Sequence, residues 1–241
     1  MLHGDESQAV DLSFSIPSVC AQRVEQGLID IGLVPVAEIA RQNLEIVPGV
    51  GITCLGAVRS ILLFSRVPWS SVRTLAGDVS SRTSVQLARV ILRERYGAEP
   101  EIRSQQPILT DMLRDADAAL IIGDPALRLR PEDFPYEFLD LGAEWLTLTG
   151  LPMVFAAWAG KPGVPSNFLE QILRASYRFG EHKIAEIVEQ EHGARGVTRE
   201  VADRYLRHHI RFDLGPREQQ GMETFLDLAG LPARGVAQSV L

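Results

Sequence analysis

Apolar runs of strand length alternate with helical patterns over the first two thirds of the chain. Four runs are continuous enough for buried strands, at residues 28–34, 58–65, 118–122 and 152–158. Weaker strand signals lie at residues 10–16, 44–47, 51–55, 72–75, 101–103 and 138–141. Helices are predicted between them at residues 19–26, 37–41 and 110–115, and residues 144–148 are expected to form a short helical or irregular turn. This alternation is typical of an α/β fold in which helices cover a mixed or parallel sheet.

The last third of the chain has a different pattern. After a Pro/Gly-rich connection, amphipathic helices are predicted at residues 167–179, 182–192, 199–207 and 217–228, and no strand signal follows Trp158. We therefore expect two α/β lobes and a helical C-terminal stretch. The chain is expected to cross between the lobes near residues 64–68 and 153–158. Lobe I would then contain residues 1–66 and 159–241, and lobe II would contain residues 67–158. Two lobes joined in this way form a hinged cleft, where ligands often bind.

Residues 72–97 combine a short strand, a turn rich in hydroxyl groups and an amphipathic helix that Gly97 is placed to end. The apolar stripe of the helix consists of Leu87, Ala88, Ile91 and Leu92. At its start, either Ser81 is the N-cap or Thr83 forms a capping box with Gln86. Free backbone N–H groups and the positive end of the helix dipole suit a carboxylate or phosphate at this point. Ordinary helix capping is the simpler alternative.

Composition and charge narrow the classes of protein that fit. The 241 residues carry a formal net charge of −7, which argues against a general nucleic-acid binder, since such proteins carry a basic stripe. Cys20 and Cys54 are too few for a disulfide framework and are predicted to be reduced and packed as small apolar side chains. The sequence has no run of 18 apolar residues, and residues 1–6 lack signal-peptide features. We expect a cytoplasmic protein that binds neither nucleic acid nor a membrane.

The common catalytic motifs are missing from the sequence. It contains no Gly-rich dinucleotide fingerprint, P-loop, His-Glu-x-x-His or nucleophile elbow. None of the histidines has the spacing of a metal site or a catalytic triad, so all are predicted to be surface or packing residues: His3, His182, His192, His208 and His209. No metal ion or organic cofactor is expected.

Four short segments place small polar groups at the ends of predicted strands. They are Val34-Pro35-Val36, Ala57-Val58-Arg59-Ser60, Ser81-Arg82-Thr83-Ser84 and Gly123-Asp124. Together they would line one cleft with hydroxyls, amide N–H groups and an arginine, but with few strong acids or bases. This set favours binding and orientation of a small carboxylate-bearing molecule, with any catalysis resting on position and electrostatics.

At these residues the sequence resembles the chorismate dehydratase family of the futalosine route to menaquinone. The matching segments are residues 27–38, 58–65, 81–84, 120–127, 141–145 and 149–158, with Tyr205-Leu206 and Leu214-Gly215 further on. They cover nearly the whole chain in order. The resemblance implies a fold similar to type II periplasmic binding proteins.

The resemblance also implies a reaction and roles for the predicted site residues. The family removes water from chorismate to give 3-[(1-carboxyvinyl)oxy]benzoate, and aromatisation of the ring supplies much of the driving force. Thr83 and Ser84, at the helix start with Arg82, would hold one carboxylate. Ser60 and the turn of Val34, Pro35 and Val36 would face the other end of the substrate. Asp124, after Gly123, would order the wall of the cleft, and Phe155 would stack on the ring. The implied partner is a small dicarboxylate, chorismate, bound by a monomer or homodimer.

One family feature is not found in this chain. Members normally begin with a strand and loop reading roughly Ser-Tyr-Leu-Asn-x-x-Pro-Leu, whose asparagine points into the active site. No catalytic residue is therefore assigned. We expect the natural start to lie further upstream, because a missing strand would leave a sheet edge unpaired. A shortened homologue is the alternative.

Two other functions compete with the dehydratase. The first is a non-catalytic cytoplasmic binding protein that closes on a small carboxylate. The second is the dihydroxynaphthoate synthase of the same pathway, which carries a histidine in its central site region. This chain has no histidine between His3 and His182, so the synthase ranks low.

Overall fold

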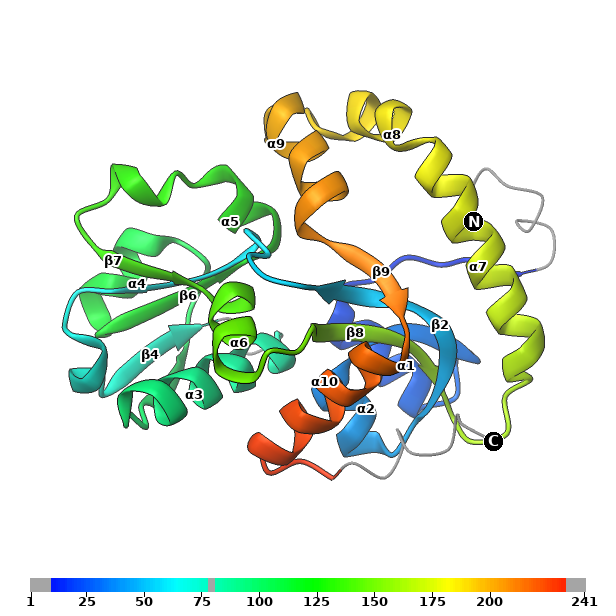
Figure 1. The fold of residues 1–241 in the computed structure, drawn as a ribbon, viewed down its shortest axis with the longest axis horizontal. Coiled ribbons are helices and arrows are strands. Elements are labelled where there is room, and N and C mark those ends of the chain that lie inside the picture. Colours follow the sequence, from blue (N-terminus) through cyan, green and yellow to red (C-terminus); the bar gives the residue numbers. More distant parts are fainter. Residues whose placement is uncertain (1–9, 78–80, 233–241) are drawn as a thin grey trace.

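The protein folds into two α/β lobes that lie side by side (Figure 1). The structure, a computed structural model, describes residues 10–77 and 81–232. The predictions for His3 and for the turn at residues 78–80 lie outside this part of the chain. Within it, the four-stranded sheet of lobe I has the order β1 (Ile31–Pro35), β8 (Met153–Gly160), β2 (Glu45–Cys54) and β9 (Arg211–Leu214). The five-stranded sheet of lobe II has the order β5 (Glu101–Ser104), β4 (Thr74–Gly77), β6 (Ala118–Ile122), β3 (Ile61–Ser65) and β7 (Glu137–Asp140).

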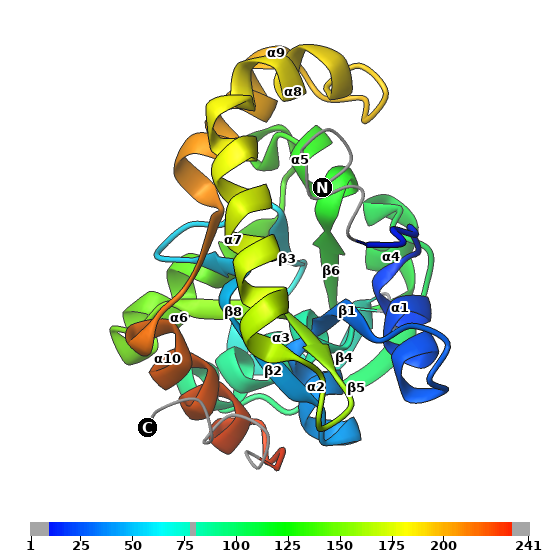
Figure 2. The ribbon, with the colours of Figure 1, turned by 90° about the vertical axis from the view of Figure 1, so that its right-hand side faces the viewer.

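Helices cover both sheets. Those that pack on lobe I are α1 (Pro17–Glu25), α2 (Val36–Gln42), α7 (Ser166–His182) and α10 (Pro216–Leu228). Those of lobe II are α3 (Arg82–Tyr96), α4 (Leu109–Asp115), α5 (Gly123–Arg128) and α6 (Leu141–Thr149), with the short turns η2 (Trp69–Ser71) and η3 (Pro131–Asp133). Figure 2 shows α7 running along lobe I towards α8 (Ile184–Glu191) and α9 (Arg199–Arg204). A π-helical turn, η4 (Tyr205–His209), follows α9 and leads into β9.

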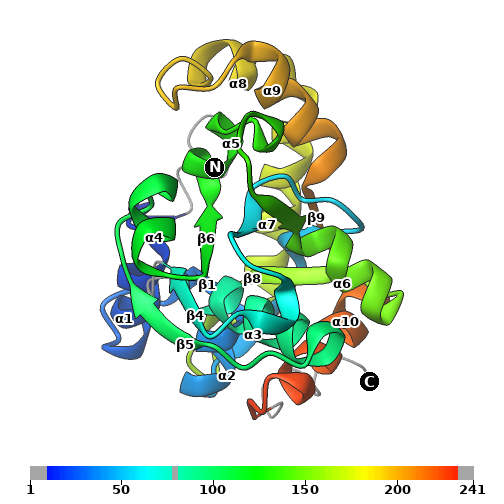
Figure 3. The same ribbon diagram turned by 90° about the vertical axis from the view of Figure 1, so that its left-hand side faces the viewer.

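Both faces of the lobe II sheet are covered, which explains its continuous apolar runs. All five residues of β3 are buried. Ile61 and Leu63 join the core that contains α3, whereas Leu62 and Phe64 join the core that contains α4. Alternate residues of a strand point to opposite faces, so a strand between two layers of helices needs apolar residues at every position. Figure 3 shows α3 and α4 around this sheet.

The strand register gathers the predicted polar segments of lobe II at one edge of its sheet. Ile61 at the start of β3 pairs with Ile122 at the end of β6. β4 runs parallel to β6 and ends at Gly77. Ser60 and Gly123 therefore lie at the same edge as the end of β4.

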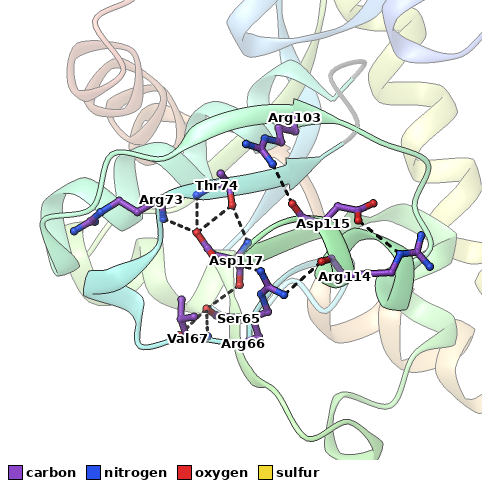
Figure 4. A network of polar contacts seen from close by, with 9 residues as sticks. All are labelled: Ser65, Arg66, Val67, Arg73, Thr74, Arg103, Arg114, Asp115 and Asp117. Carbon is purple, nitrogen blue, oxygen red and sulfur yellow. Dashed lines mark hydrogen bonds and ion pairs between the residues drawn. The ribbon is translucent and has the colours of Figure 1, made fainter.

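The opposite edge of the lobe II sheet is fastened by Asp117 (Figure 4). Its carboxylate accepts the backbone N–H groups of Arg73 and Thr74 and the Thr74 hydroxyl, each at 3.0 Å. Burial raises the pKa of the Asp117 carboxyl, but these hydrogen bonds and the charge of Arg66 outweigh it, so the pKa lies below its ordinary value. This network joins the start of β4 to the start of β6, away from the predicted site.

Two crossovers connect the lobes. Residues 55–60 lead from β2 to β3, and residues 150–152 lead from α6 to β8. Because β3 belongs to the lobe II sheet and β8 to the lobe I sheet, the changes of lobe lie about one strand earlier than the predicted boundaries after residues 66 and 158. Apolar patterns located the strands but carried no information about which sheet each strand joins.

The first crossover is held against the start of α6. Asp140 caps α6 by accepting the N–H of Gly142 at 3.0 Å. The same carboxylate accepts the N–H groups of Val58 at 2.9 Å and Arg59 at 2.6 Å. A Cβ atom at Gly142 would overlap the carbonyl oxygen of Gly56, so this close approach requires glycine.

The strand predicted at residues 10–16 is wrong. Residues 11–16 have no regular structure, and Phe14 and Ile16 are 73% and 62% exposed. A strand needs a partner, and in the described part of the chain β1 pairs only with β8. α1 begins at Pro17, a residue suited to the first helical position, which is two residues before the predicted start at residue 19.

Several other predicted elements are corrected in their bounds or type. β1 begins at Ile31, three residues later than predicted, because the chain forms a turn at residues 26–27 and a bend at residues 28–30. The two strands predicted at residues 44–47 and 51–55 are one strand, β2, with a register shift between Ile46 and Gly51. β9 is a strand after Trp158, where none was predicted, and it pairs with β2. The segment at residues 144–148 is part of the helix α6, and the predicted polar segment Gly123-Asp124 opens α5.

The strong signals are confirmed. The apolar runs at residues 58–65 and 118–122 contain β3 and β6, the run at residues 152–158 covers most of β8, and the helix after Ser81 ends at Gly97 as predicted. The helices predicted in the last third match α7, α8, α9 with η4, and α10. Cys20 and Cys54 are both free, and burial raises the pKa of the Cys54 thiol to about 12.

Candidate functional site

The start of α3 carries two buried hydroxyl side chains. Ser81 is the N-cap residue, but its side chain makes no capping hydrogen bond. Thr83 and Ser84 lie within the first turn of the helix and are 3% and 5% exposed. The alternative capping box of Thr83 and Gln86 is therefore wrong. Polar side chains buried at a helix start are placed to face another group rather than water.

The group that Thr83 faces is the start of α2. Its hydroxyl oxygen accepts the backbone N–H of Ala37 at 3.1 Å, across 46 residues of sequence. β1 ends at Pro35 and α2 begins at Val36, and both residues are buried, as is Val34. The predicted turn of lobe I and the helix start of lobe II are thus in direct contact.

A second contact between α2 and α3 joins Arg82 to Glu38. The Arg82 guanidinium donates to the Glu38 carboxylate at 2.8 Å. Arg41 and Gln42 donate to the other carboxylate oxygen at 3.0 and 3.1 Å. Burial raises the pKa of the Glu38 carboxyl, but the hydrogen bonds from Arg41 and Gln42 and the charge of Arg82 outweigh it, so the pKa is lowered. We call the Ala37–Thr83 and Glu38–Arg82 contacts the helix bridge.

A cavity of about 340 Å³ lies beside the helix bridge, between α1, α2 and the start of α3. Its lining is polar and charged except for Val19, and consists of Ser18, Val19, Gln22, Glu25, Glu38, Arg41, Gln42 and Arg82. Arg82 is the only predicted site residue in this lining. The cavity is therefore adjacent to the predicted site but is not formed by it.

The lobe II edge carries a third group of predicted residues. The Gly123 N–H donates to the Ser60 carbonyl at 2.8 Å, so the two segments are joined directly. Ser60 is 5% exposed, and its hydroxyl lies 3.2 Å from the hydroxyl of Tyr205 in η4. Asp124 pairs with Arg195 at 3.3 Å. We call the Ser60–Tyr205 and Asp124–Arg195 contacts the arm bridge, where the arm is residues 166–209, from α7 to η4.

Phe155 lies on the lobe I side of the predicted site. β1 and β8 are antiparallel, and Pro35 pairs with Ala156, so Phe155 is next to the end of β1. Its side chain is 8% exposed and belongs to the main hydrophobic core. Ring stacking on a ligand stays a prediction for this residue.

The structure therefore brings the predicted residues together as two groups. Val34, Pro35 and Val36 meet Arg82, Thr83 and Ser84 at the helix bridge, and Phe155 adjoins the same turn. Ser60, Gly123 and Asp124 meet at the lobe II edge beside the arm.

Sequence reasoning missed Glu38 and Tyr205 as members of these groups. The spacing of Glu38 and Arg41 at i and i+3 indicates a helical ion pair, but not its link to Arg82. Tyr205 contacts Ser60 across 145 residues, and no local pattern predicts that contact.

Of the histidines in the described part of the chain, His209 contacts one of the predicted segments. In the described part of the chain no three His, Cys, Asp or Glu side chains are grouped as metal ligands. The His209 ring lies at hydrogen-bond distance, 3.0 Å, from the Ala57 carbonyl, so it helps to seat η4 on the first crossover. Among the described residues no helix is long and apolar enough to cross a membrane.

Solved structures define the class of fold. The periplasmic aliphatic sulphonate binding protein of Escherichia coli superposes with a TM-score of 0.63 at 13% identity, over 92% of this chain and 80% of that one. The alkanesulfonate-binding protein of Xanthomonas axonopodis pv. citri gives 0.63 at 16% identity, over 95% and 84%. At these identities the similarity concerns the fold alone. The architecture is that of the periplasmic binding proteins, as predicted.

Sequence similarity defines the family. The family model described as menaquinone biosynthesis matches residues 1–230. The chain is also 31% identical over 208 residues to the chorismate dehydratase of Thermus thermophilus, covering 80% of this chain and 76% of that protein. The chain therefore belongs to the menaquinone biosynthesis family.

Proposed function

We propose that this protein is a chorismate dehydratase, a lyase that converts chorismate to 3-[(1-carboxyvinyl)oxy]benzoate in the cytoplasm as a step of the futalosine route to menaquinone. The observation that carries the proposal is the 31% identity to a chorismate dehydratase along 80% of the chain. The buried hydroxyls of Thr83 and Ser84 at the start of a 15-residue helix support it, since a helix start with hydroxyl donors suits a carboxylate.

The proposed substrate is a dianion, and the two groups of residues offer complementary positions for its ends. Thr83 can accept the Ala37 N–H and still donate its own proton, because a hydroxyl has one donor and two acceptor positions. One carboxylate is assigned to Thr83 and Ser84. The turn of Val34–Val36 adjoins this position, and the other end of the molecule is assigned to Ser60 in the second group.

Binding at these positions would leave Arg82 in a supporting role. Its guanidinium is already paired with Glu38 at 2.8 Å, so part of its charge is neutralised before a ligand arrives. The helix start and the hydroxyls then supply most of the attraction for the carboxylate. Asp124 would order the wall beside Ser60, and Phe155 would lie against the ring.

Dehydration of chorismate needs little covalent work from the protein. The C4 hydroxyl leaves with the C3 hydrogen, and formation of the aromatic ring provides the driving force. Holding the dianion still and stabilising the departing hydroxyl are tasks of orientation and electrostatics. The residue that accepts the C3 proton is not assigned.

Incubation of the purified protein with chorismate tests the proposal. We expect the enolpyruvyl benzoate to form at a rate proportional to protein concentration, measured by liquid chromatography with mass detection. A boiled sample controls for the spontaneous breakdown of chorismate. Product at the rate of the boiled sample would contradict the proposal.

A second candidate function is a binding protein for a small carboxylate that performs no chemistry. The observation that favours it is the fold, which the chain shares with proteins named as binding proteins. Thermal denaturation with and without chorismate separates the two functions, because any ligand that binds the folded state raises the melting temperature. Stabilisation without product would support the second candidate.

A further inference from the structure

The arm leaves lobe I, contacts lobe II and returns to lobe I. α7 packs on β2, and after α8, α9 and η4 the chain returns as β9, which also pairs with β2. In Figure 1, α9 and η4 (orange) lie close to α5 of lobe II. The Arg128 side chain of α5 donates to the Arg195 carbonyl at 2.8 Å, beside the ion pair of Arg195 and Asp124. The position of η4 is therefore fixed from both lobes.

The turn η4 is a π-helix, and its two ends rest on the first crossover. Tyr205 at its start reaches the Ser60 hydroxyl at 3.2 Å, and the His209 ring at its end lies 3.0 Å from the Ala57 carbonyl. π-Helical turns are rare and occur frequently at functional sites. The widened turn allows Tyr205 and His209, four residues apart, to contact one short segment.

Either hydroxyl of this pair can be the hydrogen-bond donor. Burial raises the pKa of the Tyr205 phenol. The hydrogen bond with Ser60 lowers this pKa and the nearby charge of Asp124 raises it, and the net result is a raised pKa. The phenol therefore keeps its proton at neutral pH and can donate it to the Ser60 oxygen. A serine hydroxyl that accepts one bond has its own proton left to donate elsewhere.

We propose that Tyr205 is a positioning residue that holds the Ser60 hydroxyl in the rotamer from which it donates to an oxygen of the bound dicarboxylate. The proposal rests on the proposed function for the identity of the ligand. Ser60 touches the substrate in this scheme, and Tyr205 acts only through Ser60. The 3.2 Å contact and the seating of η4 on residues 57–60 carry the inference.

Tyr205→Phe, Ser60→Ala and the double variant test this role with chorismate as the probe. Each single variant is expected to raise KM about tenfold with little change in kcat, since one hydrogen bond to a charged ligand is lost. The double variant is expected to match Ser60→Ala, because a residue that acts only through Ser60 has no effect without it. Tyr177→Phe is the matched control. It removes a hydroxyl that donates to Glu181 on α7 at 2.7 Å, and KM should not change.

The outcomes separate positioning from a structural role. Loss of folded protein would lower the apparent kcat and the melting temperature but leave KM unchanged, and that pattern in Tyr205→Phe would overturn the proposal. A rise in KM of about 100-fold in the double variant would show that the two substitutions act independently, and this would overturn the proposal as well.

Activity and binding measurements on the unaltered protein show separately whether the proposed function is wrong. If it binds chorismate but forms no product, the same cycle is measured on the dissociation constant, with the same expected tenfold steps. If the unaltered protein does not bind chorismate, both proposals are wrong.

Discussion

The helix bridge and the arm bridge both connect the lobes, but they are built from different chemistry. In Figure 1, α2 and α3, which form the helix bridge, lie in the lower half of the view, and α5 and α9 lie in the upper half. The helix bridge contains a buried backbone-to-hydroxyl bond and a carboxylate that is 6% exposed. The ion pair of the arm bridge is exposed by 54% at Arg195 and 35% at Asp124.

This difference indicates which contact holds the lobes together. A buried polar group that loses its partner costs its full desolvation, whereas an exposed ion pair contributes little. We therefore expect the helix bridge to contribute most of the stability between the lobes. The arm bridge contributes mainly through the Ser60–Tyr205 pair, whose role lies in placing one hydroxyl.

The largest effect is expected for ligand binding at the helix bridge. Thr83→Val combined with Ser84→Ala removes both hydroxyls at the start of α3. Each lost bond to a charged ligand is worth about 1.5–3 kcal/mol, so the loss of two such bonds should weaken chorismate binding by at least about 100-fold in calorimetric titration. Thr83→Ser keeps the hydroxyl and is the matched control. Unchanged affinity in the double variant would contradict the assignment of a substrate carboxylate to these two residues.

The next effect concerns the stability of the helix bridge. Glu38→Ala leaves the guanidinium groups of Arg41 and Arg82 without their shared partner. Breaking a buried pair costs about 3–5 kcal/mol, but the two arginine side chains are 45% and 53% exposed. Solvent screening reduces the expected loss to about 1–3 kcal/mol, measured by urea denaturation at neutral pH. A loss no larger than that of Arg195→Gln would contradict the comparison.

Because Glu38 is a titratable group, its contribution to the free energy of unfolding should depend on pH. Its folded-state pKa is below the ordinary value of 4.5, so the ionised carboxylate stabilises the fold at pH values above 4.5. That contribution is lost as the pH falls through the lowered pKa. The stability difference between the natural protein and Glu38→Gln should therefore be constant near neutral pH and shrink in acid. A stability difference that grows in acid would contradict this prediction.

The smallest effect is expected for the exposed ion pair of the arm bridge. Arg195→Gln should change the free energy of unfolding by about 0.2–1 kcal/mol, the range of exposed pairs. The effect should decrease further in high salt because the pair is screened. Arg204→Gln, which breaks an exposed pair with Glu200 within the arm, is the control. If Arg195→Gln lowered the free energy of unfolding by more than Glu38→Ala does, the ranking of the two bridges would be reversed.

The sequence alone determined the elements whose signals are local. The helix from Arg82 to Tyr96 has its apolar stripe, its N-cap position at Ser81 and its terminal Gly97 within one short stretch of chain. The run at Ile61–Ser65 is apolar on both faces and was correctly predicted as a buried strand. The family resemblance also came from the sequence, because the matched segments keep their order along the chain.

Only the tertiary structure decided how these elements meet. The strand predicted at residues 10–16 failed because a strand exists only with a partner, and periodicity does not say whether a partner is present. β9 was missed because four residues give too short a pattern, and its pairing with β2 makes it a strand. Ala37 meets Thr83 and Ser60 meets Tyr205 because the lobes and the arm dock in one arrangement. Such contacts, 46 and 145 residues apart, depend on the packing of whole elements and not on any local sequence pattern.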